Sequence, residues 1–515
     1  MVSSNAPTRT AAGGTGRLLV TDRSSRDPAT AALLERMRDD GVRTVLTGSD
    51  AILPAGMQRL SVTRRGHNTT VLRRAVRCLR AGGALLLVDD AAPRGALRTR
   101  VGLARRGRLV RALARLGGAA VVPVQARPAT GRAPPRWLRV RDRSGGDAVH
   151  VGAALPWHRI EAFEADLEVG RYLRLRVGML GASARGRGVA RRHTGAPPRA
   201  VAEAVDAGAL AAELAALPPA SHLLDHGPYT VYWAHARALP LTLREIGRLR
   251  ELAFREAGEG TGGDVDLDVH DAYYRHLFVW HRDRREVVGG YRLGLSDEIL
   301  ARFGRRGLYS HTLFRLRTRL VRNLDPAIEL GRSFVRPEYQ REYQPLMLLW
   351  RGIARFVTRY PRYTVLFGPV SISASYQAVS RQLLVDFLTR TRMRPDLASA
   401  VRPRRPFRGM RRTIWREADF TGIHSIEDLS ELIEQIEADA KGVPVLLRQY
   451  LRLGGCLLGF NVDDRFSDVL DGLLMVDLLD ADRRALRRYF GHDGLAAFEA
   501  YHREREHAAV RRDER

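Results

Sequence analysis

Short apolar runs alternate with arginine-rich amphipathic segments in the first third of the chain. The apolar runs cover residues 17–21, 44–47, 84–89, 119–125 and 173–177. Strands separated by helices in this way are typical of an α/β domain. We therefore expect an α/β domain over residues 1–180. A linker over residues 181–203 should follow, because it begins in a stretch rich in Gly, Arg, Ala and Pro.

A second α/β pattern occupies residues 204–515. Its predicted strands are residues 229–234, 286–293, 327–335, 364–369 and one or more within 457–476. Its predicted helices are residues 243–257, 345–358, 376–389 and 426–440. Ser425 and Asp428 have the spacing of an N-terminal capping box for the last of these helices. The pattern predicts a mixed sheet with flanking helices.

Composition limits the class of protein. A length of 515 residues with 45% hydrophobic residues is enough for two to four domains. No apolar run reaches the roughly 18–20 residues of a membrane span, and residues 1–16 lack the apolar core of a signal peptide. Cys78 and Cys456 have no cysteine or metal-spaced histidine near them, so we expect neither disulfides nor a metal site. A cytoplasmic protein is expected.

The chain is strongly basic, with a formal net charge of +28 and an isoelectric point near 11.1. Such a charge is typical of proteins that bind nucleic acid, anionic lipid or acidic proteins. Lys441 is the only lysine, so the arginine bias is equally consistent with the codon usage of a GC-rich genome. No helix-turn-helix, zinc finger or aromatic-basic sheet motif is recognisable, and we expect no specific nucleic-acid partner.

Residues 328–340 combine an acid, a base and a glycine within a predicted strand. Glu329 and Arg332 are three positions apart, so in a regular strand they would point to opposite faces. A bulge near Gly331 would bring both onto one face, and bulges are frequent beside active sites. The pair is therefore either part of a reaction centre or an ion pair at a sheet edge.

Several segments together resemble a known family. They are residues 244–255, 258–262, 266–277, 290–294, 328–340 and 366–373. The chain resembles the N-acyltransferases that make lyso-ornithine and related amino-acid lipids. This hemolysin-like family belongs to the GNAT superfamily and is similar to acyl-homoserine lactone synthases. The resemblance covers about residues 228–390 and extends to residues 444–455 and 458–463. It implies transfer of an acyl group from an acyl-carrier-protein thioester to the α-amine of an amino acid.

The resemblance also implies roles for individual residues. An α-amine has a pKa near 8, so a base must remove a proton before it attacks the thioester. Glu329 falls where the lactone synthases have a glutamate base, and Arg332 where an arginine orders the site. The set that holds the N-terminal segment over the site in those enzymes corresponds to Arg250, Phe254, Asp268, Asp271 and Arg292. Its carboxylates would bind the substrate's ammonium group or fix Arg250, and ordinary helix capping is the alternative.

Further residues of the matching segments complete the predicted site. Ser333, Phe334 and Ser371 are expected to contact substrate, and Tyr376 to protonate the leaving thiolate, although packing at a helix start is the alternative for Tyr376. The turn before the helix at 345–358 lacks the glycines with which many GNAT enzymes hold a diphosphate. Pro345 at the first helical position would still leave N–H groups for one phosphate. We therefore expect the phosphopantetheine of an acidic acyl-carrier protein, rather than coenzyme A, as donor.

The N-terminal half resembles another family over residues 62–178. Its pattern is similar to glycerolipid (lysophospholipid) O-acyltransferases, which use a His-x-x-x-x-Asp motif. No histidine of this chain has an aspartate five positions later; the corresponding position after His67 is Leu72. We therefore expect a shortened, degenerate acyltransferase-like domain without activity.

A candidate membrane-binding helix lies within this half. Three arginines share one predicted helical face beside a leucine stripe, namely Arg108, Arg111, Arg115, Leu109, Leu113 and Leu116. This is the pattern of a basic amphipathic helix on an anionic membrane, and equally that of a core-packed helix with a solvated arginine face.

Three functions remain. The first is a cytoplasmic N-acyltransferase, peripheral to the inner face of the cell membrane, that forms a lyso-aminolipid. The second is a bifunctional N-/O-acyltransferase, against which the missing histidine motif argues. The third is a non-catalytic basic scaffold for membrane or nucleic acid, against which the Glu329 and Arg332 pair argues.

Overall fold

The computed structural model describes most of the chain, with gaps. The described residues are 17–21, 28–47, 53–61, 69–88, 96–127, 148–155, 157–183, 198–409, 420, 423–437 and 439–513. Contacts group the chain into two compact units. One contains Met1–Arg187, Gln377–Ser380 and Met410–Gly442, and the other contains Gly188–Tyr376, Arg381–Gly409 and Val443–Arg515. The predicted limits 1–180, 181–203 and 204–515 stay predictions.

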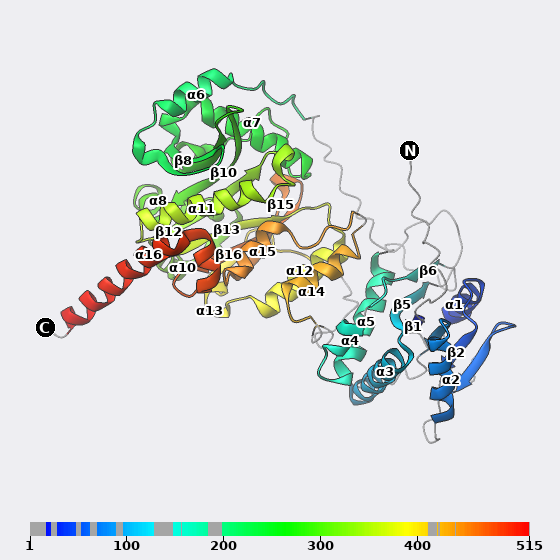
Figure 1. The fold of residues 1–515 in the computed structure, drawn as a ribbon. Helices are drawn as coiled ribbons and strands as arrows, with labels where there is room; N and C mark the ends of the chain where they lie inside the picture. The colour runs from blue at the N-terminus through cyan, green and yellow to red at the C-terminus, as the bar shows by residue number, and fades with distance from the viewer. Residues whose placement is uncertain are drawn as a thin grey trace. The chain divides into compact units, whose positions relative to one another are not determined.

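The first unit is built on a six-stranded sheet in the order β3-β2-β4-β1-β5-β6 (Figure 1). Its strands are β1 Arg17–Thr21, β2 Thr44–Thr47, β3 Gln58–Ser61, β4 Ala84–Val88, β5 Ala120–Arg127 and β6 Ala148–Val151. The first five run parallel, and β6 pairs antiparallel with β5. Its helices are α1 Pro28–Asp39, α2 Thr69–Arg80, α3 Ala96–Gly117, α4 Trp157–Glu161, α5 Asp166–Ser183 and α14 Ile426–Glu434. Apolar residues of α1 and of the parallel strands form its core.

The strand predicted at residues 173–177 is wrong, because these residues lie inside α5. The alternation of leucine and arginine suggested a strand. Burial instead follows helical spacing, with Val169, Tyr172, Leu173 and Val177 all buried. Arg176 is buried too, and its guanidinium lies over the Tyr172 ring. An arginine at an apolar position therefore hid the period of the helix.

The second unit is built on an eight-stranded mixed sheet in the order β15-β16-β13-β12-β10-β9-β8-β7. Its strands are β7 His222–His226, β8 Tyr229–His235, β9 Arg275–His281, β10 Glu286–Leu295, β12 Ala327–Val335, β13 Val365–Ile372, β15 Cys456–Asp463 and β16 Val469–Asp477. Only β12 and β13 are parallel neighbours. The short strands β11 Phe314–Leu316 and β14 Val401–Pro403 form a separate pair.

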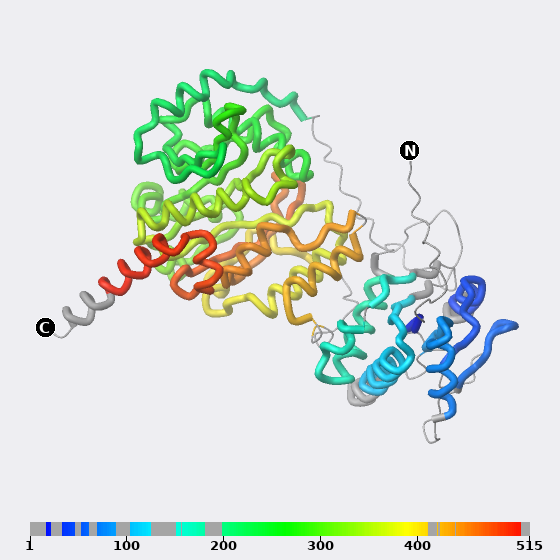
Figure 2. The backbone as a smooth tube through the Cα atoms, viewed as in Figure 1, coloured from blue at the N-terminus to red at the C-terminus, as the bar shows by residue number. Residues whose placement is uncertain are grey.

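Helices cover both faces of this sheet (Figure 1). They are α6 Ala207–Ala215, α7 Pro240–Glu256, α8 Ser296–Phe303, α9 Ser310–Leu313, α10 Thr318–Asn323, α11 Tyr343–Arg359, α12 Ala378–Thr391, α13 Pro395–Ala398, α15 Val445–Arg452 and α16 Arg483–Asp513. Gly352 of α11 packs closely against Val231 and Leu277. On the opposite face, α6 and α7 share a core with Phe278 and Phe334. α16 lies beside α11 (Figure 2). The expected mixed sheet with flanking helices is confirmed.

Two boundaries in the predicted helices need correction. α11 begins at Tyr343, so Pro345 is its third residue and not its first. α14 ends at Glu434, six residues before the predicted end. Its capping box is confirmed, since Ser425 accepts from the Asp428 N–H and Asp428 accepts in return from the Ser425 N–H.

The parallel strands β12 and β13 separate after only three residue pairs. Register pairing runs only from Ala327 opposite Val365 to Glu329 opposite Phe367, although both strands continue. Beyond this point β12 stays with β10 and β13 stays with β16. At the fork, a Cβ on Gly368 would lie 2.1 Å from the carbonyl oxygen of Leu330. Only glycine allows this approach of the two strands before they separate.

The bulge predicted near Gly331 is confirmed. Arg292 is opposite Gly331 and Gly290 is opposite Phe334, so β12 has one more residue than β10 over this interval. The residue with left-handed backbone geometry is Arg332, at φ 50°, and not the glycine. A non-glycine residue in this region is strained, and such strain persists where the surroundings hold the residue firmly.

Candidate active site

Glu329 is held at the fork by three hydrogen-bond donors. Its carboxylate accepts from the backbone N–H groups of Tyr309 at 2.9 Å and Ser310 at 2.5 Å, where α9 begins. The Tyr274 hydroxyl donates a third bond. Burial, with the adjacent Glu329 charge, raises the pKa of Tyr274 well above its ordinary value, so that hydroxyl stays a donor. Glu329 is 1% exposed, and its carboxylate is fixed on three sides.

Arg332 lies on the same side of β12 as Glu329. Its guanidinium donates to the Tyr309 hydroxyl at 3.0 Å, while the backbone of that tyrosine binds Glu329. The guanidinium also lies over the rings of Tyr309 and Phe466, at 4.8 and 4.4 Å from their centroids. The bulge therefore does what the sequence predicted: it turns the acid and the base toward one side. Tyr309 separates them, so they form no direct ion pair.

Arg332 belongs to a closed ring of ion pairs made of three arginines and three aspartates. In order around the ring they are Arg250, Asp266, Arg332, Asp268, Arg292 and Asp271. Neighbouring members are 2.7 to 3.3 Å apart, and each makes two pairs. The charges of the ring cancel. Four of the six were predicted as substrate-binding residues and a fifth, Arg332, as a catalytic one; the structure joins them to Asp266.

The pKa values of two carboxyl groups of the ring, Asp268 and Asp271, are lowered. Burial on its own would raise the pKa of Asp268, but a hydrogen bond from His270 and the charges of Arg292 and Arg332 hold it far below its ordinary range. Burial opposes ionisation of Asp271 as well, and the nearby arginines still lower its pKa. The cavity bounded by Arg250, Arg292 and Arg332 has no room for a water molecule, whereas the Asp268 side chain is 27% exposed. These aspartates therefore fix the arginines. Asp268 and Asp271 also form the capping box of the short helix at residues 269–272, so the capping alternative is observed as well.

The remaining predicted residues occupy different surroundings. Phe254 and Phe334 belong to the apolar core beneath α7. Ser333 is the second residue of the bulge. Ser371, on the diverging part of β13, donates to the Glu259 carboxylate at 2.8 Å. Tyr376 is buried in the turn between β13 and α12, and its role as an acid stays a prediction.

Sequence reasoning missed Asp266, Tyr274 and Tyr309. The repeated aspartates between residues 264 and 271 were a signal for Asp266, since every second residue shares a face in extended chain. No sequence motif around Tyr309 predicts its contact with Glu329, which is 20 residues away in the chain. Its contact depends on the path of the chain through α8 and α9.

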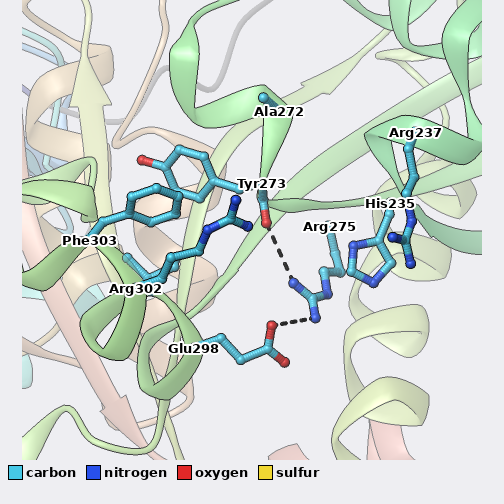
Figure 3. Close-up of a pocket in the computed structure, with 9 residues that line it drawn as sticks. His235, Arg237, Ala272, Tyr273, Arg275, Glu298, Arg302 and Phe303 are labelled. Atoms are coloured by element: carbon cyan, nitrogen blue, oxygen red, sulfur yellow. Dashed lines mark hydrogen bonds and ion pairs between the residues drawn. The ribbon is translucent and has the colours of Figure 1, made fainter.

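A surface pocket of about 220 Å³ opens beside the start of β9 (Figure 3). Tyr273 and Phe303 form one wall, their ring centroids 4.4 Å apart. Arg275 crosses the pocket to donate to Glu298 at 2.6 Å. None of the residues predicted for the site lines it. The predicted residues pack against one another around the fork of β12 and β13.

Two further expectations concern metal binding and membrane spans. No group of histidine, cysteine, aspartate or glutamate side chains that could hold a metal ion occurs among the described residues. No described helix is long and apolar enough to cross a membrane.

Two of the three arginines of the candidate membrane helix α3 have partners within their own unit, whereas Arg115 is exposed. Arg108 and Arg111 both pair with Asp166, and Arg111 also donates to the Phe163 carbonyl. Leu113 is buried and Leu116 is about half exposed. These contacts favour the core-packed alternative for this helix.

Comparison with known proteins identifies the family of the second unit. Residues 249–351 match the acetyltransferase (GNAT) domain family. A glycine N(alpha)-acyltransferase of Bacteroides thetaiotaomicron is 32% identical over 267 residues, which are 48% of this chain and 77% of that protein. A glycine N(alpha)-acyltransferase of Phocaeicola vulgatus is 30% identical over 260 residues, covering 48% and 79% of the two chains.

A third relative is named for a different amino acid. It is the L-ornithine N(alpha)-acyltransferase of Rhodobacter capsulatus, 29% identical over 249 residues, which are 46% of this chain and 85% of that protein. No solved structure matches the chain significantly. The matched domain contains Glu329 and the whole ion-pair ring. The chain therefore belongs to the GNAT acyltransferases and, within them, to the N-acyltransferases named above.

Proposed function

We propose that this enzyme transfers a fatty acyl group from an acyl thioester to the α-amine of an amino acid, glycine or ornithine being the first candidates, to give a lyso-aminolipid. The observation that carries the proposal is the fork at which β12 leaves β13, with Glu329 and Arg332 turned to one side of it. The names of the relatives supply the amino acids to test first.

The reaction requires three proton movements. The substrate ammonium first gives a proton to a base, and the free amine attacks the thioester carbonyl to form a tetrahedral intermediate. The nitrogen then loses its second proton, and the C–S bond breaks as the leaving sulfur takes up a proton to become a thiol. Backbone N–H groups at the bulge would stabilise the negative oxygen of the tetrahedral intermediate, since the ladder between β12 and β13 ends at Glu329.

Glu329 is our candidate for the base. Three donors already occupy its carboxylate, which has about four lone-pair positions, so a proton can arrive at the remaining one. Tyr376 would protonate the thiolate from the turn after β13.

The test compares Glu329→Gln with Tyr274→Phe. Loss of a general base lowers kcat by about 10²- to 10⁴-fold, whereas Tyr274→Phe keeps the carboxylate and should lower it far less. Acyl-glycine and acyl-ornithine would be measured by mass spectrometry. An amide cannot accept all three bonds, and a stability loss of about 1–3 kcal/mol should accompany Glu329→Gln.

Normal turnover by Glu329→Gln would exclude Glu329 as base. Equal losses in both variants would point instead to a structural role for the whole hydrogen-bonded group.

An acyl-carrier protein is our proposed donor. Tyr343 and Gln344, and not Pro345, open α11, so their N–H groups are the ones available to a single phosphate at this end. The basic chain would attract an acidic carrier protein. Association with the inner face of an anionic membrane, and an inactive O-acyltransferase-like first domain, belong to the same proposal.

A further inference from the structure

Asp471 is a buried carboxyl group without a partner. It lies on β16, 6% exposed, with Ser371 of β13 and Asn461 of β15 as its register neighbours. Within the described residues, no hydrogen bond or ion pair reaches its carboxylate. Burial raises the pKa of Asp471 well above its ordinary value, and the charges of Asp463 and Glu259 add to the effect. Buried polar groups are nearly always satisfied, so this exception needs an explanation.

Two further acids approach the same place. Glu259, in the loop after α7, is bound by Ser371 across the strand from Asp471. Asp463, at the end of β15, accepts only the Arg465 backbone N–H at 3.0 Å. The nearby cation is Arg332, and its guanidinium is already shared by Asp266 and Asp268. Burial raises the pKa of all three acids, in contrast to the lowered pKa values of Asp268 and Asp271 in the neutral ring.

Asp471 lies on the strand next to the β13 branch of the fork. Ser371 is four residues beyond Phe367, the last residue of β13 paired with β12. Asp471 shares a face with Ser371, because directly opposite residues project to the same side of a sheet. Arg332 lies in the bulge of β12, which is the other branch of the fork, and its positive charge opposes the rise in the pKa of Asp471. A ligand entering the fork would meet Asp471 and Glu259 on the β13 side.

The substrate brings a positive charge to this fork. Asp266, Asp268 and Asp271 each have two arginine partners, so they cannot also neutralise an ammonium group. We propose that Asp471, assisted by Glu259, binds the ammonium group of the amine substrate before acyl transfer. The inference rests on the proposed function and gives it an amine-binding position that none of the residues predicted from the sequence occupies.

Binding of the ammonium group should change the protonation of Asp471. In the empty site, burial and the acidic neighbours disfavour the carboxylate form of Asp471, so the group keeps its proton to higher pH than an ordinary aspartate. Binding of an ammonium ion makes the carboxylate favourable, so the carboxyl proton leaves to solvent while the ammonium keeps all of its own. Amine binding should release up to one proton and tighten as the pH rises, until the amine itself deprotonates.

The test uses the full chain with Asp471→Asn. Asp477→Asn is the matched control, because Asp477 lies on the same strand and accepts from the Leu479 N–H, which an asparagine oxygen can also do. Glycine and L-ornithine serve as amines and a palmitoyl thioester as donor. We expect Asp471→Asn to raise the KM for the amine at least tenfold, with the KM for the donor unchanged. Asp477→Asn should match the wild type in both constants.

Calorimetry in buffers of different ionisation enthalpy gives a second readout that needs no turnover. Wild type should release a proton on binding the amine, and Asp471→Asn should lose both the binding and the release. Acylation by Asp471→Asn with a normal amine KM and normal proton release would overturn the inference and leave the proposed function intact. Amine binding that depends on Asp471 in an enzyme without acylation would support the inference and contradict the proposed function. Wild type that neither binds nor acylates these amines would contradict both.

Discussion

Asp471 should lower the stability of the folded protein at neutral pH. Its pKa in the folded state is above the unfolded value of about 3.9, so below pH 4 the group is protonated in both states and has no effect. As the pH rises, the unfolded state loses the proton first, and folding becomes less favourable until the pKa of the folded state is passed. A side chain kept despite this cost is typical of a functional site.

Asp471→Asn should therefore be more stable than wild type at pH 8. The difference in Tm should shrink toward zero near pH 4, because both proteins are then neutral at this position. Differential scanning calorimetry at the two pH values measures it, with Asp482→Asn as the control for the substitution itself, because Asp482 is exposed and an asparagine oxygen can also accept from the Ala485 N–H. A stabilisation of equal size at both pH values would mean that the charge of Asp471 is not its cause.

The ring of ion pairs holds several secondary-structure elements together. Its members come from α7, the segment after that helix, β10 and β12. Breaking a buried pair by removing one partner costs about 3–5 kcal/mol, because the other charge is left uncompensated. The lowered pKa values of Asp268 and Asp271 mean that their contribution is present above about pH 4 and is lost as the pH falls below it.

Asp266→Asn should lower the free energy of unfolding by about 3 kcal/mol, because Arg250 and Arg332 each lose a partner. Asp264→Asn removes the same charge at an exposed position, and this variant should change the free energy of unfolding by less than about 0.5 kcal/mol. Urea unfolding at pH 7 would compare them. Equal stabilities of the two variants would show that the ring is energetically neutral.

The elements were more predictable than the contacts between them. β1, β2 and β12 have the limits that their apolar runs predict, since a run of buried positions is a local signal. The bulge was predictable from the odd spacing of Glu329 and Arg332, but the left-handed residue was not, because tertiary contacts hold Arg332 there. Asp471 carries no local signal. Its carboxyl group becomes buried without a partner only when β13 and β15 pair with β16.

At the scale of the whole molecule, a net charge of +28 should govern the choice of donor. An acidic carrier protein presents many charges to this surface, whereas acyl-coenzyme A presents few. We expect kcat/KM to be higher with the carrier protein at low salt, and to fall more steeply with that donor as salt is raised to about 0.3 M, because salt screens exposed charges. Thiol release at several salt concentrations measures both. Equal values with the two donors would argue against the carrier protein.

The ring also has a kinetic consequence for the fork. Four segments that are distant in sequence each contribute at least one charge to it, so none of them can leave without stranding charges on the others. Their backbone amides should therefore exchange with deuterated solvent as one cooperative group, and slowly. Entry of the amine and the donor would then leave the β12 branch in place. Local opening should instead occur on the other side, in the loop that carries Glu259.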